Sequence, residues 1–392
     1  MLRRMITLVA FGLFAAGLPA QGVDFGAWKD LSGGKDLSLW KNAKEKDGKN
    51  RWKMEDGALT QETDNGGVND ICTVEEFGSY ELELDYKVPS GGNSGVYLRG
   101  QIEVQICDST AKAGKTADLG PGDCGGIYGV AGPLKMPQKP VGEWNRYRIL
   151  HVGNQITVWH NGVLIQDNRW CDQPTGGTMG GLKIDRGPIM LQGDHSKVWY
   201  QNLRLRPLFG DGWKALWNGK DLSEFRPTND DVWKIEDHAF TNVKWGGNGG
   251  HDIWTKEPYG NFLVHYAYRS DPNIEDGNSG FYLRDQWEIQ ILGSQSKEAH
   301  SDAALYDCKG VDVLARHDDP LRWNYMDVKV EGMKISVWQN GKLIHEGVQL
   351  DRRTDSAGTP TKEFSKKPFK LQGDHGRVWF SQLFIKPLPD TK

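Results

Sequence analysis

The chain carries the same sequence pattern twice, and this duplication constrains its fold more than any other feature. The segment GNSGVYLRGQIEVQI from Gly92 recurs as GNSGFYLRDQWEIQI from Gly277, and LQGDHSKVWYQNLRLRPL recurs as LQGDHGRVWFSQLFIKPL. Three further blocks, beginning at 33, 51 and 156, recur in the same order at 218, 232 and 335. Ordered repetition of this kind indicates tandem copies of one structural unit. We therefore predict two domains, 24–208 and 211–388, joined by a short segment that contains glycine.

Within each copy, apolar residues recur at every second position, which is the period of a β-strand with one buried face. The clearest run has Tyr80, Leu82, Leu84, Tyr86 and Val88 alternating with charged residues. Asn-Gly pairs at 161–162 and 340–341 stand between β-rich segments, as in tight hairpins. Many short strands without a long helical stripe predict an all-β fold in each copy, either a β-sandwich or a jelly roll.

Residues 1–20 have the pattern of a secretory signal peptide. Arg3 and Arg4 precede a short apolar stretch from Ile6 to Leu18, and Ala20 offers a small residue for cleavage. The stretch is too short to span a bilayer comfortably, and the alternative is an uncleaved N-terminal anchor. We expect an exported protein, periplasmic or secreted, with no further membrane contact.

Composition narrows the range of partners. The 48 Lys and Arg residues nearly balance the 52 Asp and Glu residues, which argues against nucleic acid as a partner. The 16 Trp residues suit either sandwich cores or platforms that stack on sugars.

The five cysteines include no CxxC pair, so a structural zinc site is not expected. An odd count leaves at least one thiol unpaired, and Cys107 with Cys124 is the first pair to consider for a disulfide.

A set of large polar residues recurs on the same strand faces in both copies. Alternation places Tyr97 and Arg99 on one face of their strand, and Glu103 and Gln105 on one face of the next. Asn93 precedes them in an Asn-Ser-Gly sequence. Such side chains can make several directional hydrogen bonds to sugar hydroxyl groups. The alternative is an ordinary cross-strand network that pairs Arg99 with Glu103.

The sequence Gln-Gly-Asp-His is the second recurring polar motif. It comprises Gln192 to His195 in the first copy and Gln372 to His375 in the second, in a turn before the last strand. A histidine beside an aspartate can serve as a general base, or both can have structural roles. No cofactor is evident, and a divalent cation held by carboxylates, histidine and carbonyl groups remains open.

These segments, together with GGIYGVAGP, KPVGEWNRYRI and VWHNGVLI, resemble the 3-keto-disaccharide hydrolase family once per copy. The resemblance implies a concanavalin A-like sandwich and an enzyme that acts on oxidised sugars, as 3-keto-glucoside 1,2-lyase and 3-keto-2-hydroxy-glucal hydratase. A ketone at C3 acidifies the C2 hydrogen, so a base can remove that proton, the C1 substituent leaves, and water adds back. The chemistry requires a base, a group that polarises the keto oxygen and an acid for the leaving oxygen.

The resemblance also suggests residue roles. Glu103 and His195 are the acid/base candidates, and Asp108, which completes the family-like stretch, is counted with them. Arg99 and Gln192 would bind or polarise sugar oxygens. The residues expected to line the pocket or stack on the ring are Asn93, Tyr97, Gln105, Tyr128 and Trp159. The corresponding second-copy residues are Tyr282, Arg284, Glu288, Gln290, Tyr306, Gln372 and His375.

The two copies differ around these positions. Asp108 is replaced by Gly293, and GGIYGVAGP by AALYDCKGV. We therefore expect the first copy to be the better catalyst, and the second to be weakened, altered in specificity or limited to binding. Two other functions remain open for the whole chain, a lectin-like module that binds glycans and a scaffold without a ligand.

Overall fold

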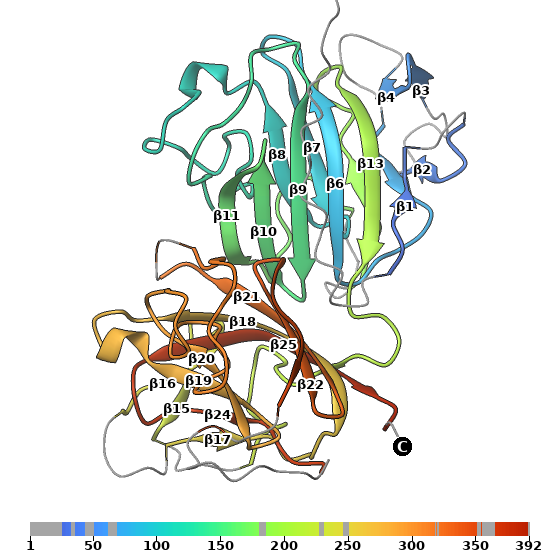
Figure 1. Cartoon of the computed structure of the whole chain (residues 1–392). Coiled ribbons are helices and arrows are strands. Elements are labelled where there is room, and N and C mark those ends of the chain that lie inside the picture. Colours follow the sequence, from blue (N-terminus) through green and yellow to red (C-terminus); the bar gives the residue numbers. More distant parts are fainter. Residues whose placement is uncertain are drawn as a thin grey trace, which may run out of the picture.

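The computed structural model describes residues 26–32, 36–43, 51–61, 69–179, 186–226, 231–245, 251–317, 319, 321–350, 354 and 365–390. It consists of two β-sandwiches, each built from one large and one small antiparallel sheet (Figure 1). The only helical elements in these ranges are the short 3-10 turns η1 (Thr110–Lys112) and η2 (Glu275–Gly277). The all-β prediction and the tandem arrangement are both confirmed. The predicted signal peptide lies outside the described residues.

In the first domain the large sheet has the order β11-β10-β9-β6-β13-β4-β3, and β1 also pairs with β13. Its strands are β1 (Lys29–Asp30), β3 (Trp52–Glu55), β4 (Ala58–Gln61), β6 (Tyr80–Lys87), β9 (Asn145–Val152), β10 (Gln155–His160), β11 (Val163–Trp170) and β13 (Trp199–Pro207). The small sheet has the order β2-β5-β12-β7-β8. Its strands are β2 (Trp40–Asn42), β5 (Ile71–Thr73), β7 (Asn93–Leu98), β8 (Ile102–Cys107) and β12 (Met190–Leu191).

The second domain repeats this plan. Its large sheet has the order β15-β16-β25-β18-β21-β22-β23, with β14 paired to β25, and its small sheet has the order β17-β24-β19-β20. The large-sheet strands are β14 (Lys214–Ala215), β15 (Trp233–Glu236), β16 (Ala239–Asn242), β18 (Asn261–Ser270), β21 (Asn324–Glu331), β22 (Lys334–Gln339), β23 (Lys342–Gln349) and β25 (Val378–Leu388). The small-sheet strands are β17 (Ile253–Trp254), β19 (Ser279–Leu283), β20 (Trp287–Ile291) and β24 (Lys370–Leu371).

The hairpin turns follow the predicted chemistry. Asn161 and Gly162, between β10 and β11, both have positive φ, and so do Asn340 and Gly341 between β22 and β23. Two successive residues with positive φ form the turn whose twist matches that of the flanking strands, and Asn-Gly adopts it at low cost. The two pairs therefore set the register of equivalent hairpins.

The alternation in β6 is present, but its charged face is not fully solvated. Glu81 is buried on the outer side of the large sheet and accepts hydrogen bonds from Arg148 Nε at 2.5 Å and Arg206 Nε at 2.6 Å. Asp85 is likewise buried and bonded to Arg146 at 2.7 Å. Arginines on neighbouring strands compensate these buried charges, so the side predicted to be wet is largely covered.

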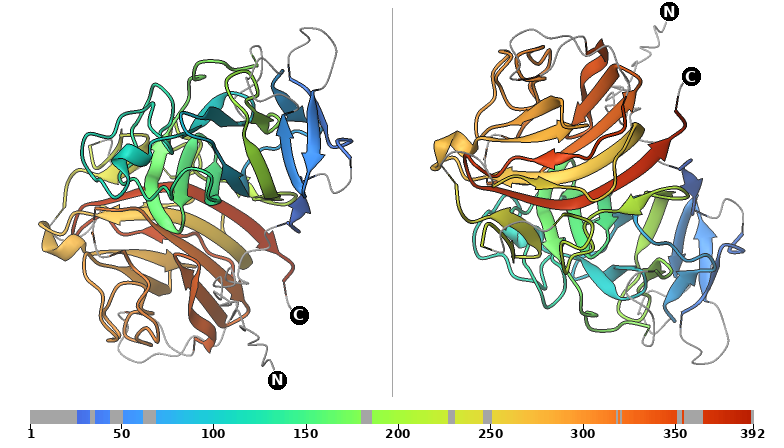
Figure 2. Two further views of the ribbon diagram at one scale, coloured as in Figure 1. Left: turned by 90° about the horizontal axis from the view of Figure 1, so that it is seen from above. Right: turned by 90° about the horizontal axis from the view of Figure 1, so that it is seen from below.

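The outer faces of the two large sheets pack against each other at the domain interface (Figure 2). Gln155 Nε2 of β10 donates to Ser381 Oγ of β25 at 2.6 Å, and the hydroxyl groups of Thr157 and Tyr325 lie 2.7 Å apart. Trp170 stacks on His238 with ring centroids 4.2 Å apart. The small sheets therefore lie on the sides of the molecule away from this interface. Within the described part of the chain, no helix is long and apolar enough to cross a membrane.

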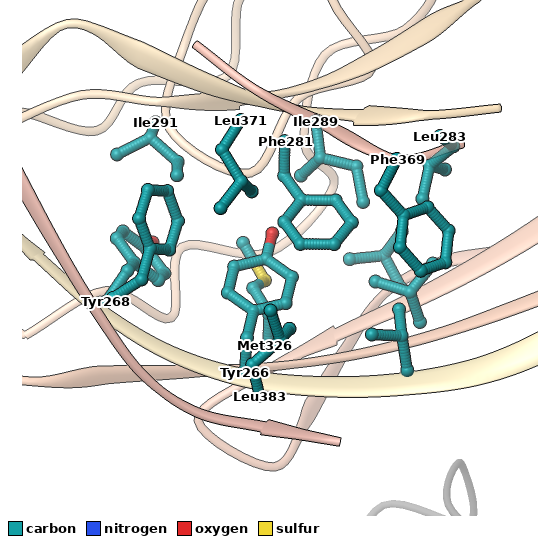
Figure 3. Close-up of a cluster of buried hydrophobic side chains, with 14 of the residues drawn as sticks. Tyr266, Tyr268, Phe281, Leu283, Ile289, Ile291, Met326, Phe369, Leu371 and Leu383 are labelled. Carbon is teal, nitrogen blue, oxygen red and sulfur yellow. The ribbon is translucent and has the colours of Figure 1, made fainter. Parts of the chain in front are cut away.

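Aromatic rings bridge the two sheets in the core of the second domain (Figure 3). Phe281 of β19 stacks on Tyr266 of β18 with centroids 4.3 Å apart and planes within 5°. It also contacts Phe369, whose ring lies at 5.4 Å. Offset stacking adds to the stabilisation from burial of these rings, so Phe281 connects the small sheet to the large one.

Phe281→Ala should destabilise the second domain by about 3–5 kcal/mol, because it removes a buried ring and leaves a cavity. Urea denaturation of the full chain followed by tryptophan fluorescence measures this loss. Val313→Ala is the control, since Val313 is exposed and its truncation should shift the midpoint little. Equal shifts for the two variants would contradict the role given to Phe281.

Candidate active site

A row of four residues crosses the outer face of the small sheet in the first domain. Register pairs Cys72 with Met190, Met190 with Tyr97, and Tyr97 with Glu103, on β5, β12, β7 and β8. The alternate residues of these strands, such as Val96 and Val104, lie in the core. Because strand side chains alternate between faces, the row faces away from the core. We call it the first row.

Gly95 makes room for the carboxylate of Glu103. A side chain at Gly95 would collide with the Glu103 carboxylate, so only glycine fits there. Tyr97 OH donates to Glu103 Oε2 at 3.0 Å, which fixes the orientation of the carboxyl group.

Glu103 is poised to exchange a proton near neutral pH. Burial raises its pKa from the ordinary value of 4.5 to about 7, against the opposing effects of the Tyr97 hydrogen bond and the charge of His195. The negative charges of Asp70 and Asp194 raise it further. A buried carboxyl group with a pKa close to the working pH is a common property of catalytic acids and bases.

The Gln-Gly-Asp-His loop lies beside the first row. Gln192 N–H donates to Gly95 O at 3.0 Å, and Gln192 Nε2 lies 3.4 Å from Tyr97 OH. His195 is exposed, and its Nδ1 lies 2.5 Å from Asp194 Oδ1. The tertiary structure thus brings Gln192 and His195, about 90 residues away in the chain, to Tyr97 and Glu103, as the two motifs together predicted.

Beside the first row, two buried amide oxygens have no hydrogen-bond partner among the described residues. They are Asn93 Oδ1 and Gln192 Oε1. Ser196 Oγ accepts from Asn93 N–H at 2.7 Å, which ties the two segments together. A buried acceptor without a partner is costly. Hydroxyl groups of a bound sugar could supply the missing donors.

Residues 175–179 cross over the first row. Thr175 Oγ1 accepts the Glu103 N–H at 3.0 Å, and Met179 N–H donates to Gly100 O at 3.1 Å. At Gly177, where φ is +75°, a Cβ would lie 2.6 Å from Tyr97 OH.

Tyr128, which is exposed, donates its N–H to Glu103 O at 3.1 Å, at the edge of the row. Gln105 is buried, and its Oε1 accepts the Ile106 N–H at 3.0 Å.

Three predicted residues lie elsewhere, and their placement corrects the sequence prediction. Arg99 follows β7 with φ at +53°, which breaks the alternation, and its Nε donates to Gly78 O at 2.9 Å. Trp159 is on the large sheet, where the Arg148 guanidinium lies 4.4 Å from its ring in the cavity between the domains. Asp108 caps a turn through Gly91 N–H and Thr110, and these hydrogen bonds lower its pKa.

The second domain has an equivalent row on its small sheet. Trp254, Lys370, Tyr282 and Glu288 are paired in register across β17, β24, β19 and β20. Gly280 leaves room for Glu288 as Gly95 does for Glu103. We call this the second row.

The surroundings of the second row repeat those of the first. Thr354 Oγ1 accepts the Glu288 N–H at 3.0 Å, and Tyr306 N–H donates to Glu288 O at 3.1 Å. Gln372 and His375 keep the geometry of their first-domain counterparts: Gln372 N–H donates to Gly280 O at 2.9 Å, and His375 Nδ1 lies 2.8 Å from Asp374 Oδ1. Gln290 differs from Gln105, because its Nε2 donates to Asn278 Oδ1 at 2.8 Å. Arg284 leaves its strand with φ at +51°, as Arg99 does in the first domain, and it donates to Gly332 O at 2.7 Å, so the sequence prediction is corrected for this residue too.

Some residues at these faces were missed from sequence. Asp70 Oδ1 accepts the Gly193 N–H at 2.9 Å, and Asp252 Oδ1 accepts the Gly373 N–H at 3.1 Å. The signal was available, because Asp-Ile occurs at the same place in both copies. Thr175 and Lys370 were also missed.

Neither a metal site nor the considered disulfide is seen in the described residues. No cluster of three or more His, Cys, Asp and Glu side chains suited to a metal ion occurs in those ranges. All five cysteines are free thiols. Cys107 and Cys124 are hydrogen-bonded neighbours that remain thiols, and Cys124 Sγ also lies 3.0 Å from Tyr86 OH, whereas Cys107 Sγ lies 3.3 Å from Ser109 Oγ.

Comparison with known proteins identifies the family. The model of the 3-keto-alpha-glucoside-1,2-lyase-like domain matches the chain twice, at residues 27–206 and 212–386. The chain belongs to this family. Both rows therefore lie in 3-keto-alpha-glucoside-1,2-lyase-like domains, and the protein is carbohydrate-active at the level of its family.

Individual relatives match one domain's length of the chain. A 3-keto-disaccharide hydrolase from Bacteroides thetaiotaomicron is 23% identical over 236 residues, which cover 47% of this chain and 80% of that protein. Two crystal structures of proteins from Parabacteroides distasonis, both assigned to the glycosyl hydrolases, are 28% and 30% identical. They cover 46% of this chain each, and 84% and 100% of their own chains, with TM-scores of 0.38 and 0.35.

Glu103 should make the stability of the first domain depend on pH. Its folded pKa is about 7 and its ordinary value 4.5, so between these values the unfolded chain binds fewer protons and stability falls as pH rises. Glu103→Gln should remove this loss and raise the free energy of unfolding by about 3 kcal/mol more at pH 8 than at pH 4.5.

Urea denaturation at the two pH values tests this, with the exposed Glu143→Gln as the control. A Glu103→Gln effect that is the same at both pH values would mean that the carboxyl group titrates normally.

Proposed function

We propose that the first domain cleaves 3-keto-glucosides by removal of the C2 proton, elimination of the C1 substituent and hydration of the resulting glucal. The observation that carries this proposal is the buried Glu103 carboxyl group, whose pKa is near 7, close to a histidine-aspartate pair. Family membership supports the substrate class.

Glu103 is the base in this proposal. As a carboxylate it takes the proton from C2, which the neighbouring C3 ketone acidifies, and an enolate forms. Tyr97 holds the carboxylate through its hydroxyl group. The side-chain Nε2 of Gln192 lies 3.4 Å from that hydroxyl group and can donate to the oxyanion that develops on the sugar. A positioned base contributes about 10²- to 10⁴-fold to the rate, and hydrogen bonds to the enolate oxygen add to this.

His195 is the acid for the leaving group. Asp194 pairs with Nδ1, which directs proton exchange to Nε2 of the ring. As the enolate electrons form the C1–C2 double bond, the C1–O bond breaks and the departing oxygen takes a proton. Water then adds its hydroxyl group to C1 and a proton returns to C2, so the sum of the two steps is hydrolysis. No carboxylate nucleophile is required, in contrast to retaining glycosidases.

Asn93 and Gln192 would orient the sugar. Their buried oxygens lack partners among the described residues and can accept hydrogen bonds from hydroxyl groups. This role falls to them because Arg99 and Trp159 lie away from the row. A lectin-like function uses the same contacts but has no need of a titrating carboxyl group.

Glu103→Gln should lower kcat by about 10²- to 10⁴-fold on a 3-keto-glucoside, because the amide cannot accept the C2 proton. Glu288→Gln should have a smaller effect, since we propose that the first domain is the better catalyst. Loss of the keto sugar, followed by absorbance or chromatography, measures turnover, and Glu143→Gln is the control.

The outcomes separate the alternatives. If only Glu288→Gln abolished turnover, the ranking of the domains would be reversed. Binding of 3-keto-glucosides by the unmodified chain without turnover would favour the lectin-like function.

We further propose that the protein acts after export, because residues 1–20 have the pattern of a signal peptide. Mass spectrometry of protein purified from its native host should give an N-terminus that starts at Gln21. An intact Met1 would contradict export with cleavage.

A further inference from the structure

The two rows differ in the half that lies away from the glutamate. The first row has Cys72 and Met190 where the second has Trp254 and Lys370, whereas Tyr97 and Glu103 match Tyr282 and Glu288. In the first domain, Cys72, Met190 and Tyr97 form an apolar cluster with Ala43 and Met179. The second domain thus has a partly exposed aromatic ring and a cation where the first has Cys72 and Met190, which are uncharged and fully buried.

Lys370 lies at the centre of the second row. Its Nζ is 3.6 Å from the centroid of the Tyr282 ring and 3.1 Å from Asp252 Oδ2. Its side chain is 17% exposed, so the ammonium group is held at the surface of the sheet and is still accessible. An ammonium has three N–H donors, and one suffices for the Asp252 carboxylate.

The ion pair with Asp252 does not cancel the difference in charge between the domains. Asp252 has a counterpart in Asp70, and each accepts the N–H of the glycine in its Gln-Gly-Asp-His loop. Both domains also have the Asp-His pair. Because both domains have these groups, Lys370 gives the second domain a positive charge beside Glu288 that has no counterpart at Met190 in the first domain.

Trp254 extends the second row with a flat apolar surface. It is directly opposite Lys370 in the register of β17 and β24 and is partly exposed. An indole ring in this position can stack on the apolar face of a sugar ring. A sugar lying on Trp254 would place one of its substituents next to the Lys370 ammonium.

We propose that the second domain binds sugars with an anionic substituent, that Lys370 binds this group, and that Trp254 supports the ring. This inference rests on the proposal that the two rows are sugar sites. Met190, at the corresponding position of the first domain, is buried and uncharged, so that domain has no cation there to bind an anionic group. Lys370 is therefore the residue that separates the specificities of the two domains.

Calorimetric titration of the full mature chain tests the inference with three probes. These are methyl β-D-glucuronide, glucose 6-phosphate and the neutral methyl β-D-glucoside. Lys370→Met introduces the first-domain residue and should weaken binding of an anionic probe about 10- to 100-fold, as expected for a lost charge-assisted hydrogen bond. Lys370→Arg should retain most of the affinity. Lys366→Met, which removes an exposed ion-paired lysine, should leave it unchanged.

The choice of probe identifies the anionic group. Lys370-dependent binding of the glucuronide points to a carboxylate, and Lys370-dependent binding of glucose 6-phosphate points to a phosphate ester. Binding of either should weaken as salt is raised, because added ions screen the attraction. The inference is overturned if neither probe binds more tightly than the neutral glucoside, or if Lys370→Met and Lys366→Met have equal effects.

The binding measurements on Lys370 variants and the turnover measurements on Glu103 variants test separate proposals. Turnover of a 3-keto-glucoside that depends on Glu103 would persist if Lys370 had no part in binding. Lys370-dependent binding of an anionic sugar would likewise persist if Glu103 were not a base. Thermal melting of Lys370→Met separates a loss of binding from a loss of the fold.

Discussion

The pairing of β7 with β8 is the contact on which the candidate site depends. It places Tyr97 directly opposite Glu103, and it places Gly95 where a side chain would otherwise collide with the carboxylate. A shift of one residue in this register would exchange the two faces of each strand and send Glu103 into the core. Hydrophobic residues on the inner face, including Val96 and Val104, oppose such a shift. The core thus holds the geometry of the candidate site in place.

Burial and charge act together on this geometry. Glu103 is removed from water by the sheet beneath it and by residues 175–179 above it, and the nearby Asp70 and Asp194 add negative charge. Each effect disfavours the ionised carboxylate, so Glu103 retains its proton up to about neutral pH. The same carboxyl group on an open strand would be ionised and a weak base. The raised pKa of Glu103 is therefore set by its surroundings in the folded protein.

The arrangement of the domains places the small sheets away from the domain interface. The outer faces of the large sheets meet at the interface, and their tryptophans are already engaged with cations. Lys87 lies 5.1 Å from the Trp144 ring and 4.7 Å from the Trp199 ring, and Arg269 lies 5.0 Å from both Trp323 and Trp379. Both domains have these contacts between a cation and two tryptophan rings, and both have a row that contains a glutamate. Within the rows, the domains differ at Trp254 and Lys370, which replace Cys72 and Met190.

The sequence alone determined the fold class, the duplication and the hairpin turns at Asn161 and Asn340, because these follow from local periodicity and turn chemistry. It also indicated Glu103, Tyr97, Gln192 and His195 as candidate site residues, since each recurs with its neighbours in the second copy. Only the tertiary structure decided which of these side chains meet. Arg99 follows the alternation in sequence, yet a positive φ takes it off the strand face, and Trp159 belongs to the other sheet. Asp70 lies beside the candidate site through its hydrogen bond to Gly193, and Lys370 through strand pairing with Tyr282. Both contacts join segments that are far apart in the chain, so alternation within one strand could not predict them.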